Sequence, residues 1–295
     1  MTSLQMRLRG DGPLSKVVGV LRYEDAAEKI LRWPGASRVA KGHFRGKVDP
    51  IVLQERELLF IHVPKNAGTS VSESVYGRSV AHRSALFYKI VAPDVFDNTE
   101  TFALLRDPVD RFVSSFWFIR QGGGEEVRMD PRFSEVCRGV ETLDDLLTLV
   151  DRLRDQIYLL DNSLRAQSWY VCDGSGKPIV PHLFIMGEQD EALARFLADH
   201  GKPALAHRNA TRKGTLHVTD AHRNRILSLY AADVRLIEGA RHAGLTPFPR
   251  RASAGVLTLG APANGRRPMG YLMKWNTPTW QTSTEPSVWV SPLPN

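Results

Sequence analysis

The sequence predicts an α/β fold in which a central parallel sheet is covered by helices on both faces. Two short apolar runs, at 58–63 and 101–105, have the continuous hydrophobicity of strands that are buried on both faces. Helical patterns lie between and after these runs, and such alternation of strand and helix is typical of a parallel sheet. Ligands of these sheets bind at the carboxyl ends of the strands, so the residues after each strand are candidates for a functional site.

Proline and glycine bound the helices in the first half of the chain. Pro34 and Gly35 end one helical pattern, Pro108 suits the first turn of another helix, and the run 122–124 of three glycines ends it. The elements predicted here are a helix over 26–33, the strand at 58–63, a helix from the following turn through about Tyr76, the strand at 101–105 and the helix from Pro108.

The second half contains longer helical patterns and one stretch that resembles a hairpin. Apolar residues recur with helical spacing over 142–168, with an expected break near 153–156. The segment 169–187 predicts two strands around the turn at 173–176, of which 182–186 is the better one. The remaining predicted elements are helices, one over 189–200 with Gly201 as its stop, and one long helix over 219–243.

Composition restricts the class of protein. The 295 residues are 42% hydrophobic and 24% charged, which excludes a collagen-like, coiled-coil or fully disordered chain. Two cysteines, Cys137 and Cys172, cannot build a disulfide framework, so a reducing compartment is expected. The sequence has no apolar run near the roughly 18 residues of a membrane span and no apolar signal region at its start. A cytoplasmic protein without a transmembrane segment is therefore predicted.

The net charge of +7 lies in the flanks of the chain. Residues 1–58 and 250–295 each carry a net charge of +4, whereas residues 59–249 carry −1. A nucleic-acid-binding protein would be expected to gather basic residues on its folded core, so nucleic acid is not an expected partner. The middle of the chain is instead expected to be an enzyme with local basic sites.

A small, hydroxyl-rich turn, PKNAGTS at 64–70, follows the first strand and opens a helix. Backbone N–H groups at such a turn point toward an anion, Lys65 adds a positive charge, and Thr69 and Ser70 add hydroxyl donors. The order differs from a Walker A loop, because Lys65 precedes Gly68 and no magnesium-binding hydroxyl follows the lysine directly. The turn therefore predicts phosphate binding without a metal, and an ordinary turn with Lys65 in solvent is the alternative.

A second motif, RDPVDRFVS at 106–114, follows the second strand. Arg106 lies at the strand end, and Ser114 lies about two turns into the next helix. Both side chains can therefore point at one anion above the sheet edge that carries the first motif. The alternative is a surface pair of Arg106 with Asp107, with Ser114 simply packed.

Together the two motifs, FIHVPKNAGTS and, about 40 residues later, FALLRDPVDRFVSSF, resemble those of sulfotransferases that use 3′-phosphoadenylyl sulfate. The resemblance is to the carbohydrate sulfotransferase superfamily, with its bacterial members and the heparan sulfate 2-O type. It implies a P-loop NTPase-like three-layer sandwich, in which the first motif holds the 5′-phosphosulfate and the second holds the 3′-phosphate. The residues implied are Lys65, Asn66, Ala67, Gly68, Thr69 and Ser70 for the 5′ loop, and Arg106 and Ser114 for the 3′-phosphate.

The same resemblance implies further site residues. His82, in the stretch between the two motifs, is similar in position to the histidine implicated as the base in the 2-O type. The segment 209–214 resembles the late loop that closes over the nucleotide, with Thr211 and Lys213 as binding residues. Asn66 stands where the family often has threonine, and asparagine still supplies a donor.

The resemblance covers residues 58 to about 243. The expected organisation is an N-terminal extension over 1–50, a sulfotransferase domain over 51–249, and a C-terminal extension over 250–295 that is rich in proline, threonine and serine.

The implied reaction transfers a sulfuryl group from 3′-phosphoadenylyl sulfate (PAPS) to an acceptor hydroxyl of a carbohydrate or glycolipid, leaving adenosine 3′,5′-bisphosphate (PAP). Lys65 would stabilise the leaving charge and His82 would accept the acceptor's proton. The acidic residues after the triple glycine, Glu125, Glu126 and Asp130, are the alternative bases. No metal is expected. A P-loop nucleotide kinase and a non-catalytic binder of anionic glycans remain the alternative functions.

Overall fold

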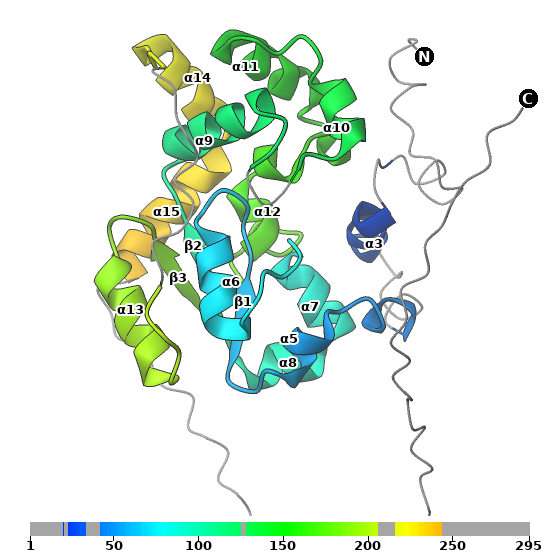
Figure 1. The fold of residues 1–295 in the computed structure, drawn as a ribbon, viewed down its shortest axis with the longest axis vertical. Coiled ribbons are helices and arrows are strands. Elements are labelled where there is room, and N and C mark those ends of the chain that lie inside the picture. The colour runs from blue at the N-terminus through cyan, green and yellow to red at the C-terminus, as the bar shows by residue number, and fades with distance from the viewer. Residues whose placement is uncertain (1–19, 21–22, 34–41, 125–127, 206–215, 244–295) are drawn as a thin grey trace, which may run out of the picture. The chain divides into compact units, whose positions relative to one another are not determined.

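The described part of the chain is built on a three-stranded parallel sheet (Figure 1). The structure is a computed structural model, and it describes residues 20, 23–33, 42–124, 128–205 and 216–243. The strands are β1 (Leu58–Ile61), β2 (Glu100–Leu105) and β3 (His182–Ile185), in the spatial order β1-β2-β3. β1 and β2 lie at the two apolar runs of the sequence, and β3 lies at the better strand of the predicted pair, so these three strands are confirmed. β1 ends two residues before its apolar run does.

The central strand β2 pairs in parallel with both of its neighbours. Ile61 lies opposite Ala103, and Leu105 lies opposite Ile185. Every side chain of β1 is buried, as expected for a strand that is covered on both faces. Because the strands run in the same direction, the chain leaves Ile61 and Leu105 at the same edge of the sheet.

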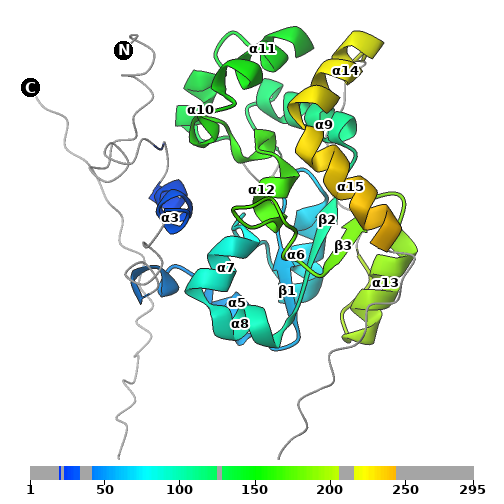
Figure 2. The same cartoon turned by 180° about the vertical axis from the view of Figure 1, so that it is seen from behind.

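Helices surround the sheet. They are α3 (Tyr23–Leu31), α5 (Pro50–Gln54), α6 (Gly68–Tyr76), α7 (Ala85–Val91), α8 (Pro93–Asn98), α9 (Pro108–Arg120), α10 (Pro131–Val136), α11 (Leu143–Leu153), α12 (Gln167–Val171), α13 (Asp190–Asp199), α14 (Asp220–Leu229) and α15 (Ala231–Ala243). The views from opposite sides in Figures 1 and 2 show α6 over one face and α7, α12 and α15 over the other. Within the described ranges, no helix is both long and apolar enough to cross a membrane.

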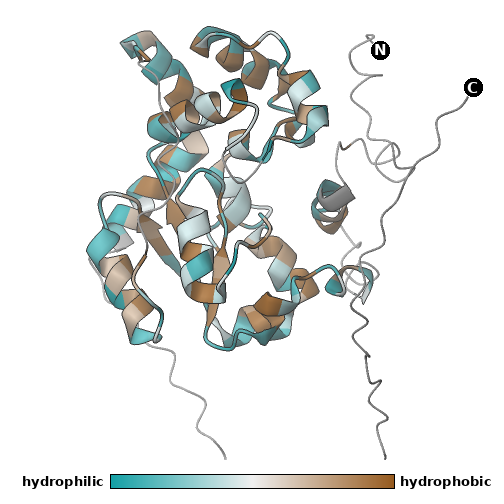
Figure 3. Cartoon of the chain, in the orientation of Figure 1, coloured by the Kyte–Doolittle hydropathy of each residue, from teal (hydrophilic) through white to brown (hydrophobic). Residues whose placement is uncertain are grey.

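Buried apolar side chains form two large clusters among the described residues. The first surrounds the sheet and includes Phe60 and Phe102, whose ring centroids are 5.1 Å apart. The second lies among α9, α10, α11 and α14, and includes Phe112, Phe133 and Leu146. Figure 3 shows the corresponding pattern, with apolar strands and with helices that are apolar on one side and polar on the other. Helix α9 follows β2 and therefore links the sheet to the second cluster.

Helix α3 lies in the stretch predicted as an N-terminal extension, and it packs on the core. Ala27 and Leu31 belong to the buried cluster around the sheet. Asp25 forms an ion pair with Arg165, with 2.7 Å between Nη1 and Oδ1. Residues 23–31 therefore belong to the same folded body as the sheet.

The predicted first strand within 169–187 is reduced to a single antiparallel bridge, Cys172 to Pro178, across the expected turn, and the residues up to Val171 belong to helix α12 instead. The Asp233 carboxylate accepts hydrogen bonds from the backbone N–H groups of Gln167 and Ser168, at 2.8 Å each. A carboxylate at a helix start caps the first N–H groups and complements the helix dipole. The cap comes from 66 residues further along the chain, so the local pattern does not reveal this helix.

The predicted single helix over 219–243 is two helices, α14 and α15, which meet at Tyr230. The buried Tyr230 hydroxyl donates a hydrogen bond to the Leu164 carbonyl at 2.7 Å, and this contact holds the chain at the break. The pattern over 142–168 breaks after Leu153, as predicted, but short 3-10 turns rather than an α-helix follow the break.

Candidate functional site

The loop between β1 and α6 has an unusual backbone. Lys65 has a φ of +69° and Ala67 a φ of +56°, whereas Asn66 between them has no positive φ. The left-handed conformation costs energy for residues that carry a side chain, so the surrounding structure must hold it. Backbone that alternates in this way turns successive N–H groups toward one concave side, where an anion can bind.

Two arginines of the second motif hold this loop. The Arg106 Nη1 donates a hydrogen bond to the Lys65 carbonyl at 3.1 Å, and the Arg111 Nε donates to the Pro64 carbonyl at 3.1 Å. Arg111 is 3% exposed, and its Nη2 has no hydrogen-bond partner within the described residues. Sequence reasoning missed Arg111, although it lies within the second motif. A buried guanidinium with an unused N–H group is well suited to bind an anion.

Helix α6 begins at this loop without a side-chain cap. Its N-cap residue is Ala67, which has no side-chain oxygen, and no side-chain cap hydrogen bond is formed there among the described residues. The N–H groups of Gly68, Thr69 and Ser70 are the first of the helix, where the positive end of the helix dipole lies. Anions bind at such helix starts, so this end of α6 and the loop form one candidate anion site.

Gly68 is required at the start of α6 because the His62 ring lies against it. A Cβ at this position would overlap the Cδ2 and Nε2 atoms of the His62 imidazole. The imidazole is buried, and its Nδ1 donates a hydrogen bond to the Val80 carbonyl at 2.9 Å. The ring therefore has little room to move away.

We expect Gly68→Ala to displace the start of α6 from the loop. Overpacking of this kind costs about 1–3 kcal/mol, which should lower the melting temperature. If the site binds PAP, the nucleotide that the sequence resemblance implies, its affinity measured by calorimetry should fall about tenfold or more, because the first N–H groups lose their alignment. The control is Gly239→Ala in α15, where an added Cβ meets open space. If Gly68→Ala binds PAP as the wild type does, the helix start is not part of the site.

The Asn66 side chain is engaged inside the protein. Its Nδ2 donates hydrogen bonds to the Leu104 carbonyl and to the Gln167 Oε1, both at 2.7 Å, and the residue is 1% exposed. The donor expected from this side chain is therefore used within the protein rather than offered to a ligand. Asn66 ties the loop to the end of β2, and only its backbone N–H can serve the site.

Gln167, which lies outside both motifs, joins them. Its Oε1 accepts hydrogen bonds from the Asn66 Nδ2 at 2.7 Å and from the backbone N–H of Arg106 at 2.9 Å. Its Nε2 donates to the Arg106 carbonyl at 2.8 Å. Asp233 holds Gln167 in turn through its backbone N–H. Sequence reasoning missed Gln167 and Asp233, because each acts through partners more than 60 residues away and no local motif marks it.

The Lys65 ammonium lies among other positive charges. Burial lowers the pKa of Lys65 to about 8; the Asp161 carboxylate opposes this shift, and Arg106 and Arg111 add to it. The Nζ lies 4.5 Å from the centroid of the Phe118 ring. Lys65 is therefore half-buried rather than in open solvent, and it is mostly protonated at pH 7. A phosphate bound between these cations would relieve their mutual repulsion.

Ser114 lies on the face of α9 that meets the loop. Arg111, three residues earlier, bonds to Pro64, and Phe118, four residues later, contacts the Lys65 Nζ. Positions three and four residues apart share a helix face, so Ser114 lies between these two contacts. Arg106 and Ser114, the pair predicted for the 3′-phosphate, are thus both beside the loop.

Asp107 has another role than pairing with Arg106. Its carboxylate caps α9 by accepting hydrogen bonds from the N–H groups of Val109 at 2.9 Å and Asp110 at 3.0 Å. Within the described ranges no ion pair joins Asp107 to Arg106. Burial lowers the pKa of Arg106, against the effect of the two neighbouring carboxylates.

His82 lies against His62, in the extended segment between α6 and α7. The two ring centroids are 4.0 Å apart, and the His82 Nδ1 lies 3.1 Å from the His62 carbonyl. Because a carbonyl only accepts, the Nδ1 carries the proton, which leaves the His82 Nε2 as the basic nitrogen. Burial lowers the pKa of His62 well below its usual value, and the neighbouring His82 adds to this effect. His62 is therefore neutral at pH 7, and His82 is the more exposed of the two rings.

Some predicted residues fall outside the described part of the chain, and one described residue has another role. Thr211 and Lys213 fall outside the described residues, as do the alternative bases Glu125 and Glu126. The third alternative, Asp130, caps α10 and pairs with Arg132, with 2.6 Å between Oδ2 and Nη2. Asp130 is therefore engaged within its own helix start.

Over the described ranges, no group of three or more histidine, cysteine, aspartate or glutamate side chains is arranged to hold a metal ion. The chain matches no protein-family model, and no curated protein is significantly similar to it. The function must therefore be argued from the site itself.

Proposed function

We propose that this protein is a sulfotransferase on a P-loop NTPase-like sandwich, which moves a sulfuryl group from PAPS to an acceptor hydroxyl. The observation that carries the proposal is the hydrogen bond from Arg106 to the Lys65 carbonyl, at 3.1 Å. This bond joins the two motifs that resemble the donor site of sulfotransferases, at the edge of the sheet where ligands bind. Lys65, Arg106 and Arg111 supply three positive charges there, beside the uncapped start of α6.

PAPS carries a phosphosulfate at the 5′ position of its ribose and a phosphate at the 3′ position. The site offers a separate set of hydrogen-bond donors for each group. Lys65 and the N–H groups of residues 67–70 would bind the 5′-phosphosulfate, because preorganised donors stabilise charge on phosphate oxygens. Arg106 and Ser114 would bind the 3′-phosphate, and the charged hydrogen bonds of a guanidinium suit this group. Arg111 would hold the loop from beneath and add positive charge.

In the proposed reaction, the acceptor oxygen attacks sulfur in line with the bridging oxygen of the phosphosulfate. An S–O bond forms to the acceptor, the S–O bond to the phosphate breaks, and its electron pair stays on the 5′-phosphate of PAP. Lys65 stabilises that developing charge. The acceptor's proton passes to the Nε2 of His82. His82 is suited to this step because it packs on His62, whose ring lies directly against Gly68 at the start of α6.

The acceptor class rests on the resemblance alone. We propose a hydroxyl of a carbohydrate or glycolipid, modified in the cytoplasm. Incubation of the protein with ³⁵S-labelled PAPS and fractionated glycans and lipids should transfer the label to one fraction. That fraction then identifies the acceptor.

Nucleotide binding separates the proposal from its alternatives. We expect PAP to bind at least about tenfold more tightly than ATP with Mg²⁺ in calorimetry. Sulfuryl transfer should persist in EDTA, because the proposed steps use protein cations and a histidine. Preference for ATP with Mg²⁺, or activity that EDTA abolishes and Mg²⁺ restores, would favour a nucleotide kinase. A protein that binds anionic glycans but neither nucleotide would be a non-catalytic binder.

Arg106→Ala should discriminate between donors with and without a 3′-phosphate. Loss of a charged hydrogen bond costs about 1.5–3 kcal/mol, so the Kd of PAP should rise about 10–150-fold. Adenosine 5′-phosphosulfate, which lacks the 3′-phosphate, should be weakened much less. The control is Arg120→Ala, which changes an arginine at the end of α9 that bonds to the Val140 carbonyl instead. Equal weakening of both nucleotides by Arg106→Ala would indicate that Arg106 acts by holding the loop at the Lys65 carbonyl, and would argue against a 3′-phosphate site at this residue.

A further inference from the structure

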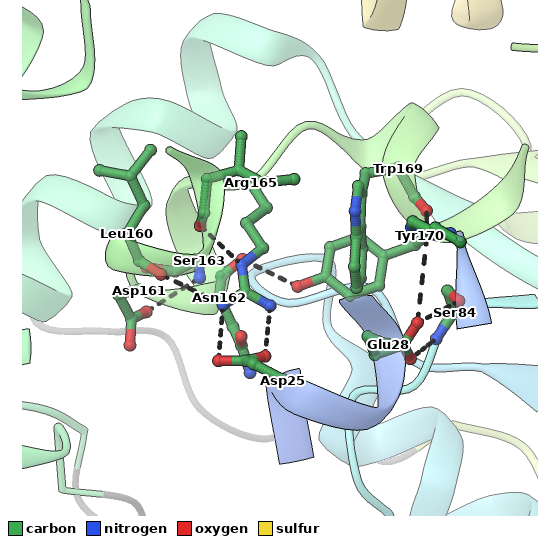
Figure 4. Close-up of polar contacts among 12 residues, drawn as sticks. Asp25, Glu28, Ser84, Leu160, Asp161, Asn162, Ser163, Arg165, Trp169 and Tyr170 are labelled. Carbon is green, nitrogen blue, oxygen red and sulfur yellow. Dashed lines mark hydrogen bonds and ion pairs between the residues drawn. The ribbon is translucent and has the colours of Figure 1, made fainter. Parts of the chain in front are cut away.

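Helix α3 contributes two buried carboxylates that lie one turn apart (Figure 4). Asp25 and Glu28 are each 2% exposed. In Figure 4, Asp25 projects toward Arg165 and Glu28 projects toward Ser84, on opposite sides of the Trp169 ring in that view. A buried carboxylate is costly unless it has strong partners, so the partners of each one show which part of the chain it holds.

Glu28 holds both the backbone and the side chain of Ser84. Its Oε1 accepts a hydrogen bond from the Ser84 N–H at 2.9 Å, and its Oε2 accepts one from the Ser84 hydroxyl at 2.7 Å. The Ser84 hydroxyl oxygen in turn accepts from the Phe87 N–H at 3.1 Å and caps α7. Glu28 therefore fixes the point at which the chain enters α7.

That point is two residues after His82. The segment from His82 to Ser84 is held at one end by the contact of His82 with the His62 carbonyl, and at the other end by Glu28. Ser84 has no exposed surface, so its backbone cannot shift without moving its neighbours. The orientation of the His82 ring therefore depends on the Glu28 carboxylate, although Glu28 lies 54 residues earlier in the chain.

Asp25 offers a contrast on the same helix. Its carboxylate forms two parallel hydrogen bonds with the Arg165 guanidinium, at 2.7 and 2.8 Å. Arg165 also donates to the Ile157 carbonyl at 3.1 Å. Asp25 thus fastens α3 to the segment 157–165.

We infer that Glu28 is a positioning residue for His82, which acts through Ser84 and does not touch the donor. This inference rests on the proposed function, in which His82 accepts the acceptor's proton. Glu28 would hold the imidazole at the angle that the proton transfer needs. A base that is misplaced by a fraction of an ångström loses rate while donor binding is retained.

The first test compares Glu28→Gln with Asp25→Asn, two changes of carboxylate to amide on one helix. Glutamine keeps one acceptor for Ser84 but turns an NH₂ group toward the second donor. We expect Glu28→Gln to lower kcat about 10–100-fold and to leave the Kd of PAP within about twofold. The imidazole NMR signals of His82, assigned with His82→Asn, should shift. Asp25→Asn should lower the melting temperature at least as much without shifting those signals.

The second test is a double-mutant cycle of Glu28→Gln and Ser84→Ala. It shows whether the two residues affect kcat as one unit, even if Asp25→Asn does not fold. Ser84→Ala removes the hydroxyl through which Glu28 acts. The double variant should lose no more kcat than the more affected single variant, because the two residues form one unit. Additive losses would overturn the inference, as would unchanged His82 signals in Glu28→Gln or equal shifts in Asp25→Asn. If the wild type transfers no sulfuryl group, the proposed function fails, whereas the His82 signals still report on the coupling.

Discussion

Lys65→Ala is expected to lower kcat/KM for PAPS about 10²–10³-fold while the fold stays intact, since this is the cost of removing one preorganised donor from a developing oxyanion. The Lys65 side chain is half-buried and feels the charges of Arg106 and Arg111. Its Nζ lies over the Phe118 ring, 4.5 Å from the ring centroid. Its removal leaves the hydrogen bonds that hold the loop in place, because these involve the Lys65 carbonyl. Circular dichroism and the melting temperature should therefore change little.

Two further variants of Lys65 test the charge itself. Lys65→Met keeps the aliphatic chain beside Phe118 but removes the charge, so it should be as inactive as Lys65→Ala. Lys65→Arg keeps the charge and should retain more activity than either. A Lys65→Ala or Lys65→Met enzyme within a few-fold of wild type would show that the loop does not stabilise the leaving phosphate.

The pH dependence of Lys65 has a defined sign. Burial lowers the pKa of Lys65 to about 8, so the free enzyme carries this charge below pH 8 and loses it as the pH rises through that value. The kcat/KM for PAPS should therefore fall above about pH 8 with a single ionisation, because kcat/KM reports on the free enzyme. In Lys65→Arg this fall should disappear from the accessible range, since a guanidinium stays protonated. A profile that is unchanged in Lys65→Arg would assign the ionisation to another group.

His82→Asn is expected to lower kcat about 10²–10⁴-fold, the usual contribution of a general base. The asparagine amide can still donate to the His62 carbonyl, so the segment should keep its place. The affinity for PAP should stay within about twofold, because in the proposed reaction the imidazole takes a proton from the acceptor and does not bind a phosphate. Steady-state kinetics and calorimetry on the same preparation separate these two quantities.

The pH profile of kcat is a second test of His82 as the general base. The wild-type rate should fall toward acid pH, because the imidazole can accept a proton only in its neutral form. His82→Asn should lack this acid limb. Normal turnover of His82→Asn, or a parallel loss of PAP binding and rate, would mean that another group is the base. Glu125 and Glu126, which follow α9, would then be the next variants to make.

The sequence by itself determined the framework of the site. The apolar runs 58–63 and 101–105 predicted β1 and β2 correctly, because strands buried on both faces are continuously hydrophobic, whereas β3 was predicted as one of a pair of strands around a turn. Lys65 and Arg106 follow two of these strands, and the carboxyl ends of parallel strands share one edge. Lys65 and Arg106 are therefore expected to lie close together from the topology alone, without knowledge of the side-chain packing. The hydrogen bond from Arg106 to the Lys65 carbonyl shows that they do.

Only the tertiary structure decided which polar groups hold this framework together. The Asp233 cap turns an expected strand into α12, and it places Gln167 between Asn66 and Arg106. Glu28 reaches Ser84 from a helix in the stretch that was expected to be an extension. Each of these groups is buried and must find a hydrogen-bond partner, and the partner lies 56–101 residues away in the chain. Local patterns report hydrophobic periodicity and turn chemistry, whereas the pairing of buried polar groups is set when distant segments pack.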